Sequence, residues 1–195
     1  QAVLNGTTQG TKFDFVTQCL DMVMRRDGRS NVTGTYLGKT GRGRFKMHGD
    51  TALPDELDVV IHTAKNGAGA WGDGDGQFTL KSAVVGMSLF HKNGTKLHLV
   101  GLQHPISVRF PNTTAQTPGN CSWWKEADAT WSTAGCTRTP TPPPDLLGAE
   151  CLCDHLTEFA LIADAVPAGN TAITLTNETT SSDELSGGQL AGIAT

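Results

Sequence analysis

The sequence predicts a mainly β fold built from short strands joined by tight turns, and three features of the chain indicate it. Aromatic residues make up only 6% of the 195 residues, whereas the chain holds 23 glycines, a balance more typical of many turns than of a helical bundle. Short apolar stretches recur after residue 30, each bounded by Gly, Pro, Asn or Asp. One of these boundaries, Asn93-Gly94, is a typical hairpin turn because both residues tolerate positive φ.

The candidate strands follow one another between residues 32 and 110. They are Val32–Leu37, Gly43–His48, Leu57–Thr63, Gln77–Phe90, Lys96–Val100 and Ile106–Phe110. The polar and Gly/Pro-rich stretches Asn66–Gly76 and Thr137–Gly148 are expected to be loops. The tail after residue 167 is rich in Thr, Ser, Gly and acidic residues, which favours a flexible linker over residues 167–195.

Ahead of these strands, residues 11–26 show the spacing of a helix. Apolar residues three or four apart form one stripe, made of Phe13, Val16, Leu20 and Val23;. Asp27-Gly28 then predicts its end. We therefore expect a short N-terminal helix within a helical segment spanning residues 1–30, with Cys19 buried on it as a small hydrophobic residue.

Charge and sequence motifs favour the outside of a cell. The net charge of −4 gives no electrostatic footprint for nucleic acid, and no apolar run is long enough to cross a bilayer;. Six Asn-x-Ser/Thr triplets predict N-glycosylation; they begin at Asn5, Asn31, Asn93, Asn112, Asn120 and Asn177;. Together with the clustered cysteines, they predict an extracellular protein.

Four of the five cysteines, Cys121, Cys136, Cys151 and Cys153, lie within a short stretch. Four cysteines permit three pairings, and a bridge between Cys151 and Cys153 is disfavoured in an extended strand. The remaining pairings join Cys121 and Cys136 crosswise to the 151–153 strand, and each bridge contributes about 3 kcal/mol by loop closure. The alternative is a zinc site of Cys-x-Cys-x-His type, which belongs in a reducing compartment.

Directly after the last cysteine, His155-Leu156-Thr157 supplies the groups needed to cut the chain at Leu156–Thr157. A threonine hydroxyl on the carboxyl side of a peptide bond can attack its carbonyl, and a nearby imidazole can accept the hydroxyl proton. In an extended strand the two side chains share a face at about 6.5–7 Å, so a turn at Leu156 is needed to bring them together. Taken alone, the tripeptide also fits a surface histidine beside a strand threonine.

A longer pattern gives this tripeptide its context. Cys121-Ser122-Trp123-Trp124, the run from Trp131 to Cys136, and Cys151-Leu152-Cys153-Asp154-His155-Leu156-Thr157-Glu158-Phe159 follow in order. This pattern resembles the GPCR proteolysis site (GPS) motif, which closes the GAIN domain of adhesion G-protein-coupled receptors and polycystin-type proteins. The similarity extends upstream to about residue 77.

The resemblance implies a twisted antiparallel β-sandwich like GAIN subdomain B over residues 31–166, with the motif at 121–159 and disulfide-stapled C-terminal strands. It also implies disulfides Cys121–Cys151 and Cys136–Cys153, and autoproteolysis at Leu156–Thr157. Strand 157–166 would then stay bound as a tethered peptide that acts as an agonist on a downstream transmembrane region. The expected location is the extracellular face of the plasma membrane, with an unidentified extracellular ligand.

Three other classes of function remain as alternatives. The first is a non-cleaving GAIN-type adhesion or structural domain, the second an intracellular zinc module, and the third, least favoured, a turnover enzyme. We expect no metal and no cofactor, because Asp73-Gly74-Asp75-Gly76 lacks the closing Glu of a calcium loop. The remaining histidines show no ligand spacing along the sequence; they are His48, His62, His91, His98 and His104.

Overall fold

The computed structural model describes residues 7–38, 42–65, 78–140 and 148–163. Its larger sheet has nine strands. Seven of them follow one another across the sheet in the order β1 (Lys12–Val16), β2 (Leu20–Gly28), β5 (Glu56–Ala64), β7 (Val84–His91), β14 (Glu158–Ala163), β10 (Asn120–Lys125) and β11 (Thr130–Ser132). The other two are short: β6 (Thr79–Leu80) pairs with β14, and β8 (Lys96–Leu97) pairs with β7. The smaller sheet has five strands in the order β12 (Cys136–Arg138), β13 (Glu150–Cys153), β9 (Ile106–Arg109), β4 (Arg44–Lys46) and β3 (Tyr36–Leu37). Every strand pair within the two sheets is antiparallel.

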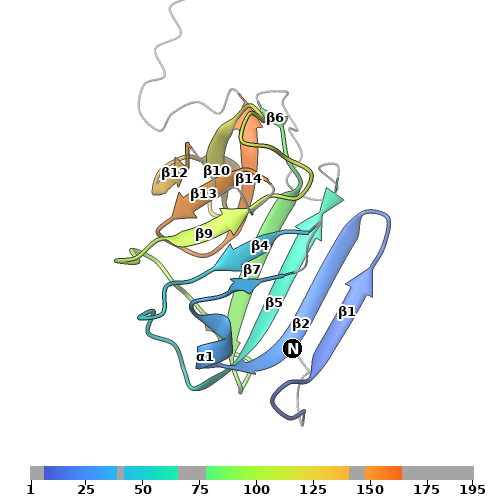
Figure 1. The fold of residues 1–195 in the computed structure, drawn as a ribbon, viewed down its shortest axis with the longest axis vertical. Helices are drawn as coiled ribbons and strands as arrows, with labels where there is room; N and C mark the ends of the chain where they lie inside the picture. The colour runs from blue at the N-terminus through green and yellow to red at the C-terminus, as the bar shows by residue number, and fades with distance from the viewer. Residues whose placement is uncertain (1–6, 39–41, 66–77, 141–147, 164–195) are drawn as a thin grey trace, which may run out of the picture.

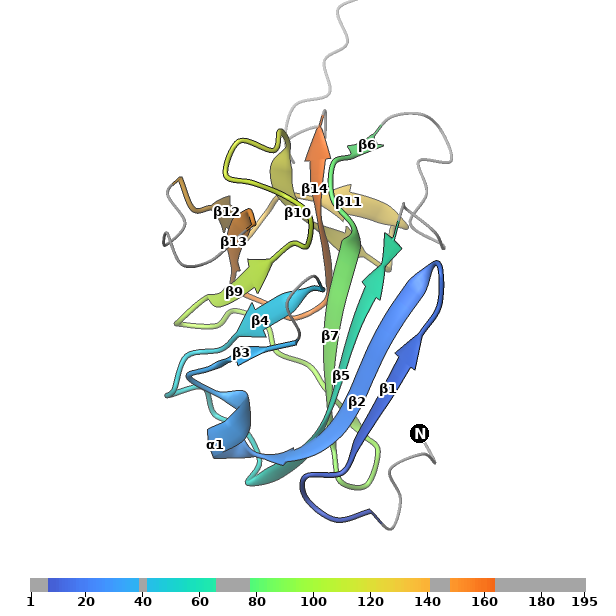
Figure 2. The same ribbon diagram turned by 45° about the vertical axis from the view of Figure 1, so that its right-hand side comes forward.

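The two sheets pack face to face, as the ribbon views show from two sides (Figures 1 and 2). The core between them draws apolar side chains from both sheets. Phe45, Met47 and Val108 belong to the small sheet or its turns, and Val59 and Leu89 belong to the large one; each is almost fully buried. The predicted β-sandwich is therefore confirmed.

Strand β14 lies inside the large sheet, between β7 and β10. Its two faces enter different clusters: Phe159 and Leu161 lie in the main core, whereas Ala160 and Ile162 pack in a second cluster with Trp131. All four β14 residues are 0% exposed. This confirms the prediction of a central strand buried on both sides, a pattern that strands acquire when both faces are covered.

The predicted helix over residues 11–26 is wrong, because these residues form the β1–β2 hairpin at one end of the large sheet. The side chains of β1 face solvent, and Phe15 and Val16 are 54% and 56% exposed. Cys19 lies in the turn of this hairpin and is exposed, so the prediction that it is buried is also wrong. The helix that the structure does contain near this region is the single turn α1 (Arg29–Val32).

The other strand predictions differ from the structure mainly at their ends. The hairpin at Asn93-Gly94 is confirmed: the Gly94 amide donates to the His91 carbonyl, and Gly94 alone of the pair takes positive φ (+85°). The predicted stretch Gln77–Phe90 is divided between β6 and β7. Loop Asn66–Gly76, most of Thr137–Gly148 and the tail after residue 167 lie outside the described residues.

Within the described ranges, no helix has the length and apolar character needed to cross a bilayer.

Candidate functional site

The Leu156–Thr157 bond lies in the short connection that carries the chain from β13 in the small sheet to β14 in the large sheet. The chain bends at Asp154 and His155 and again at Thr157. Non-glycine residues with positive φ occur, within the described residues, only at Asn112 and Ala129. The connection is therefore bent but holds no residue in the left-handed region.

Two disulfides hold β13 in place ahead of this connection. Cys136–Cys153 joins the neighbouring strands β12 and β13, where the two cysteines face each other in register. Cys121–Cys151 crosses from β10 in the large sheet to β13 in the small one. This is the pairing that the family resemblance implies, and it excludes these four cysteines as zinc ligands in the oxidised chain.

Backbone hydrogen bonds from two other segments fix the connection itself. The Leu156 amide donates to the Leu99 carbonyl at 3.0 Å, and the Leu102 amide donates to the Asp154 carbonyl at 2.7 Å. The Asp154 amide donates to the Gly135 carbonyl at 3.0 Å. A side chain at Gly135 would collide with the Asp154 carboxylate, and Gly135 also has φ +71°, so this close approach requires glycine;.

His155 is nearly buried in an aromatic pocket. Its ring lies 4.4 Å from the Trp123 ring in an edge-on arrangement and 5.9 Å from the Phe159 ring. Nδ1 lies 2.6 Å from Asp154 Oδ1, whereas the buried Nε2 has no hydrogen-bond partner among the residues that the structure describes. When the ring is neutral, its Nδ1–H donates to Asp154, so the lone pair of Nε2 is available to accept a proton.

The Thr157 hydroxyl is held by other groups than His155. Oγ1 lies 2.9 Å from Glu158 Oε2 and 3.4 Å from the Trp124 carbonyl oxygen. A hydroxyl has one proton to donate, and the shorter bond to a carboxylate is the stronger of the two. The structure therefore places Leu156, Thr157 and His155 in one small region but directs the Thr157 hydroxyl at Glu158.

Glu158 also belongs to a row of residues across the outer face of the large sheet. Gly86 pairs with Glu158 on one side and with His62 on the other. The His62 ring lies over Gly86, where a Cβ would approach its Cε1 to 2.2 Å. Burial lowers the pKa of the His62 imidazole below its ordinary value, and the negative charge of Glu158 opposes this shift.

Sequence reasoning identified His155, Leu156 and Thr157 but missed Asp154 and the more distant groups that surround them. Asp154 could have been found from the sequence as an acidic residue directly beside the candidate base His155. Glu158 stands in the same way directly after the candidate nucleophile Thr157. His62, Leu99 and Leu102 reach the site only through the fold, from strands and loops more than fifty residues away along the chain. No pattern in the sequence singles them out.

Comparison with known proteins identifies a family that includes this region of the chain. The model of one protein family, described as GPS: GAIN subdomain B, matches residues 47–167. Adhesion G protein-coupled receptor G3 from Mus musculus is 32% identical over 104 residues, which are 52% of this chain and 17% of the receptor. The same receptor from Homo sapiens is 33% identical over 100 residues, 47% of this chain and 16% of the receptor. The chain thus spans about a sixth of these relatives.

A solved structure shows a similar fold. The full extracellular region of zebrafish Gpr126/Adgrg6 superposes with a TM-score of 0.50 at 14% sequence identity, covering 77% of this chain and 23% of that one. At this identity the likeness concerns the fold alone.

Proposed function

Because the chain belongs to the GPS family, GAIN subdomain B, we propose that it is the self-cleaving juxtamembrane module of a cell-surface protein. The observation that carries this proposal is the geometry around Leu156–Thr157. A threonine hydroxyl follows the bond, and the His155 imidazole lies one residue before Leu156. Asp154 orients this ring, and its buried Nε2 has no partner in the described part of the chain. Disulfides and backbone hydrogen bonds hold this segment on both sides of the turn.

The proposed reaction is an N-to-O acyl shift followed by ester hydrolysis. His155 Nε2 accepts the Thr157 hydroxyl proton while Oγ1 attacks the Leu156 carbonyl carbon. The C–N bond then breaks as the protonated imidazole returns the proton to the Thr157 nitrogen, which leaves an ester between Leu156 and Thr157 Oγ1. Water hydrolyses the ester to a Leu156 carboxylate and a free Thr157 hydroxyl. Because nucleophile and substrate share one chain, proximity supplies much of the rate.

His155 is the proton acceptor in this proposal. Asp154 fixes its ring from Nδ1, and no described residue engages the lone pair of its buried Nε2, so the imidazole is oriented to take up a proton;. Glu158 instead binds the hydroxyl before the reaction begins. In this proposal the Thr157 side chain must leave Glu158 before its proton can pass to His155, so Glu158 slows cleavage.

After the cut, β14 would stay in the sheet without a covalent link. All four cysteines of the two disulfides precede Leu156, so neither bridge joins the fragments. The strand is hydrogen-bonded to β7, β10 and β6, and its four central residues are fully buried. Burial of this size and completed backbone pairing favour a retained strand. We propose that β14 thereby serves as a tethered peptide, with agonist action on a downstream membrane region.

An extracellular location fits the surface of the structure. Asn31, Asn93, Asn112 and Asn120 are exposed, as glycosylation at each would require; Asn5 and Asn177 lie outside the described residues. Two disulfides are formed, which is typical of an oxidising compartment;.

The second candidate function is a non-cleaving adhesion or structural domain with the same fold. One observation favours it: the Thr157 hydroxyl donates to Glu158 and not to His155. Such a domain would keep the bound strand as part of its core.

A denaturing gel of the expressed chain distinguishes the two candidates. Self-cleavage predicts a C-terminal fragment whose N-terminal sequence reads Thr157-Glu158-Phe159. Thr157→Ala and His155→Ala should each abolish this fragment, whereas Thr157→Ser, which keeps a hydroxyl, should retain it. An intact wild-type chain with both disulfides formed would establish the non-cleaving domain instead.

A further inference from the structure

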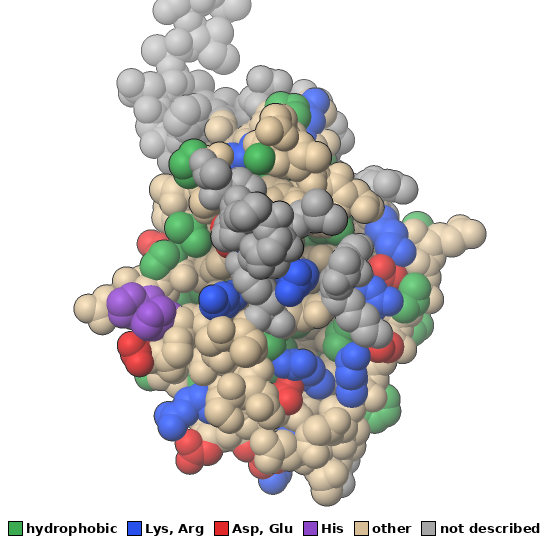
Figure 3. Space-filling view, in the orientation of Figure 1, with side chains coloured by type: hydrophobic (Ala, Val, Ile, Leu, Met, Phe, Trp, Pro, Cys, Tyr) green, Lys and Arg blue, Asp and Glu red, His purple; other side chains and the backbone are tan. Residues whose placement is uncertain are grey.

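Within the described residues, one group of side chains has the ligand atoms and spacing to hold a metal ion: His48, Asp50 and His104. His48 and Asp50 lie in the turn between β4 and β5, and His104 lies two residues before β9. One ligand atom from each residue lies within 4.8 Å of the others, and all three side chains are exposed. Figure 3 shows histidine side chains gathered beside an acidic one at an edge of the molecule.

The three side chains already approach one another without an ion. The two imidazole rings stack with their centroids 4.0 Å apart. His48 Nδ1 lies 3.4 Å from Asp50 Oδ2, and the Asp50 amide donates to the same Nδ1 at 3.3 Å. Residues from two separate loops are thus placed side by side by the fold, although their spacing along the sequence shows no ligand pattern.

Two imidazoles and one carboxylate suit zinc better than the other common divalent ions. Zinc takes nitrogen and oxygen ligands at about 2.0–2.2 Å, which places tetrahedral ligand atoms about 3.4 Å apart. Binding therefore requires the three ligand atoms to close from within 4.8 Å to about 3.4 Å of one another;. It also requires one of the two stacked rings to turn out of the stack, because imidazole lone pairs lie in the ring planes and near-parallel rings cannot both point at one ion. Exposed side chains are free to make this rotation. Calcium and magnesium prefer oxygen ligands alone. We propose that His48, Asp50 and His104 bind one Zn²⁺ ion, with water completing the coordination.

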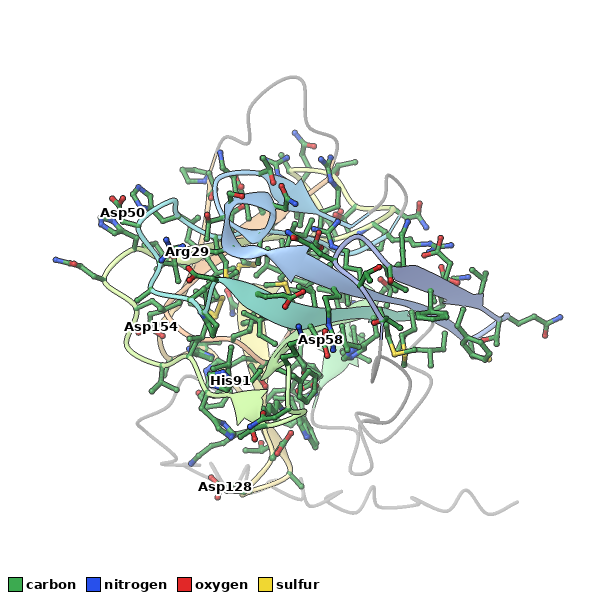
Figure 4. All side chains as sticks on the ribbon, turned by 90° about the horizontal axis from the view of Figure 1, so that it is seen from below. Arg29, Asp50, Asp58, His91, Asp128 and Asp154 are labelled. Atoms are coloured by element: carbon green, nitrogen blue, oxygen red, sulfur yellow. A yellow bond between two sulfur atoms is a disulfide. The ribbon has the colours of Figure 1, made fainter. Side chains whose placement is uncertain are left out.

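The loop that carries His104 also holds the cleavage segment. Residues 98–105 include Leu99, whose carbonyl accepts the Leu156 amide, and Leu102, whose amide donates to the Asp154 carbonyl. Asp50 and Asp154 lie on the same side of the molecule in Figure 4. An ion that joins His104 to His48 would fasten this loop to the β4–β5 turn. The three ligands come together only while residues 98–105 lie against the β4–β5 turn. Zinc binding should therefore oppose any movement of this loop away from the turn.

The experiment measures zinc binding by isothermal titration calorimetry on the wild-type chain, after removal of any histidine tag. We expect one Zn²⁺ per chain with a Kd of about 1 µM, and no heat with MgCl₂ or CaCl₂. His48→Ala and His104→Ala should each weaken binding at least about tenfold. His91→Ala, an exposed histidine on the β7–β8 hairpin, is the matched control and should bind as the wild type.

Hydrogen exchange tests the coupling to the cleavage segment. Zinc should slow exchange of the Leu102 and Leu156 amides in the wild type and not in His104→Ala. No binding up to about 100 µM ZnCl₂, or equal binding by wild type and both histidine variants, overturns the site. Specific binding without slower exchange at these two amides overturns the coupling. None of these readouts requires the chain to cleave, so their failure is separate from that of the proposed cleavage.

Discussion

In the proposed reaction, replacing Glu158 with glutamine is expected to speed cleavage at Leu156–Thr157. The Thr157 hydroxyl donates a hydrogen bond to Glu158 Oε2 at 2.9 Å. This hydrogen bond must break before the hydroxyl proton can reach His155. Glu158→Gln keeps the length of the side chain and an acceptor oxygen, but it removes the negative charge. The substitution therefore weakens the hold on the nucleophile without opening a cavity.

The size of the effect follows from this one hydrogen bond. A bond to a charged group contributes about 1.5–3 kcal/mol, and a bond between neutral groups about 0.5–1.5 kcal/mol. The carboxylate thus stabilises the unreactive state by roughly 1–1.5 kcal/mol more than an amide does. Loss of that stabilisation lowers the barrier by the same amount, so cleavage should become roughly five- to tenfold faster.

A pulse-chase experiment measures this rate, with samples stopped by denaturation and the uncleaved fraction read from a gel. Glu158→Asp is the matched control, because it keeps the charge but shortens the side chain by one methylene and so loosens the same bond. Both variants should cleave faster than the wild type. If Glu158→Gln instead slowed the rate of cleavage by about a hundredfold or more, the Glu158 carboxylate would be the group that takes the Thr157 proton. That result would refute the assignment of His155 as the base.

Two further predictions concern the folded state and are made on the uncleaved Thr157→Ala chain. Phe159→Ala should lower the free energy of unfolding by about 3–5 kcal/mol, because the ring is 0% exposed in the main core;. Leu152→Ala, at a partly exposed position, should cost clearly less in the same urea titration, and equal losses would contradict the packing described. The second prediction concerns pH: the pKa of His62 is lowered in the folded state, so the unfolded chain binds more protons and stability should fall as the pH drops through the ordinary histidine value;. Urea titrations at pH 7.5 and 5.5 should show this fall in the free energy of unfolding. The fall should be smaller in His62→Asn and unchanged in the control His91→Asn. A fall of the same size in His62→Asn as in the unsubstituted chain would contradict the prediction.

The sequence predicts the C-terminal half of this fold well because several constraints agree there. The cysteines and tryptophans identify a motif, and β14 carries apolar residues on both faces, as Phe159 and Ala160 illustrate. A strand of this kind has few alternatives, since both faces must be covered. The residues that a family pattern fixes are the ones that lie at the Leu156–Thr157 bond.

The N-terminal hairpin could not be predicted in the same way. Phe13 and Val16 have helical spacing relative to Leu20 and Val23, but a turn separates the two pairs. Phe13 and Val16 are largely exposed on the edge strand, so their hydrophobicity does not report burial. Short apolar segments fit a helix or a strand equally well, and the pairing of β2 with β5 decides between them;.

The surroundings of the Leu156–Thr157 bond depend on long-range contacts that leave no local pattern in the sequence. Leu99 and Leu102 act through backbone groups, which every residue has, so their side chains give no signal. His62 comes close to Glu158 because both strands pair with Gly86, a relation set by sheet register;. His48 and His104 also come together only through the fold, because they lie in two separate loops.

The position of β14 between β7 and β10 also determines how the strand would respond to mechanical load. Hydrogen bonds in antiparallel pairs run perpendicular to the strands. A pull along β14 from its C-terminal end therefore shears the bonds to both neighbours together, and does not peel them away one after another. Its buried side chains must leave the core in the same step. Extraction of this strand should accordingly be an all-or-none event, in which a moderate pull leaves the sheet intact until a threshold force is reached.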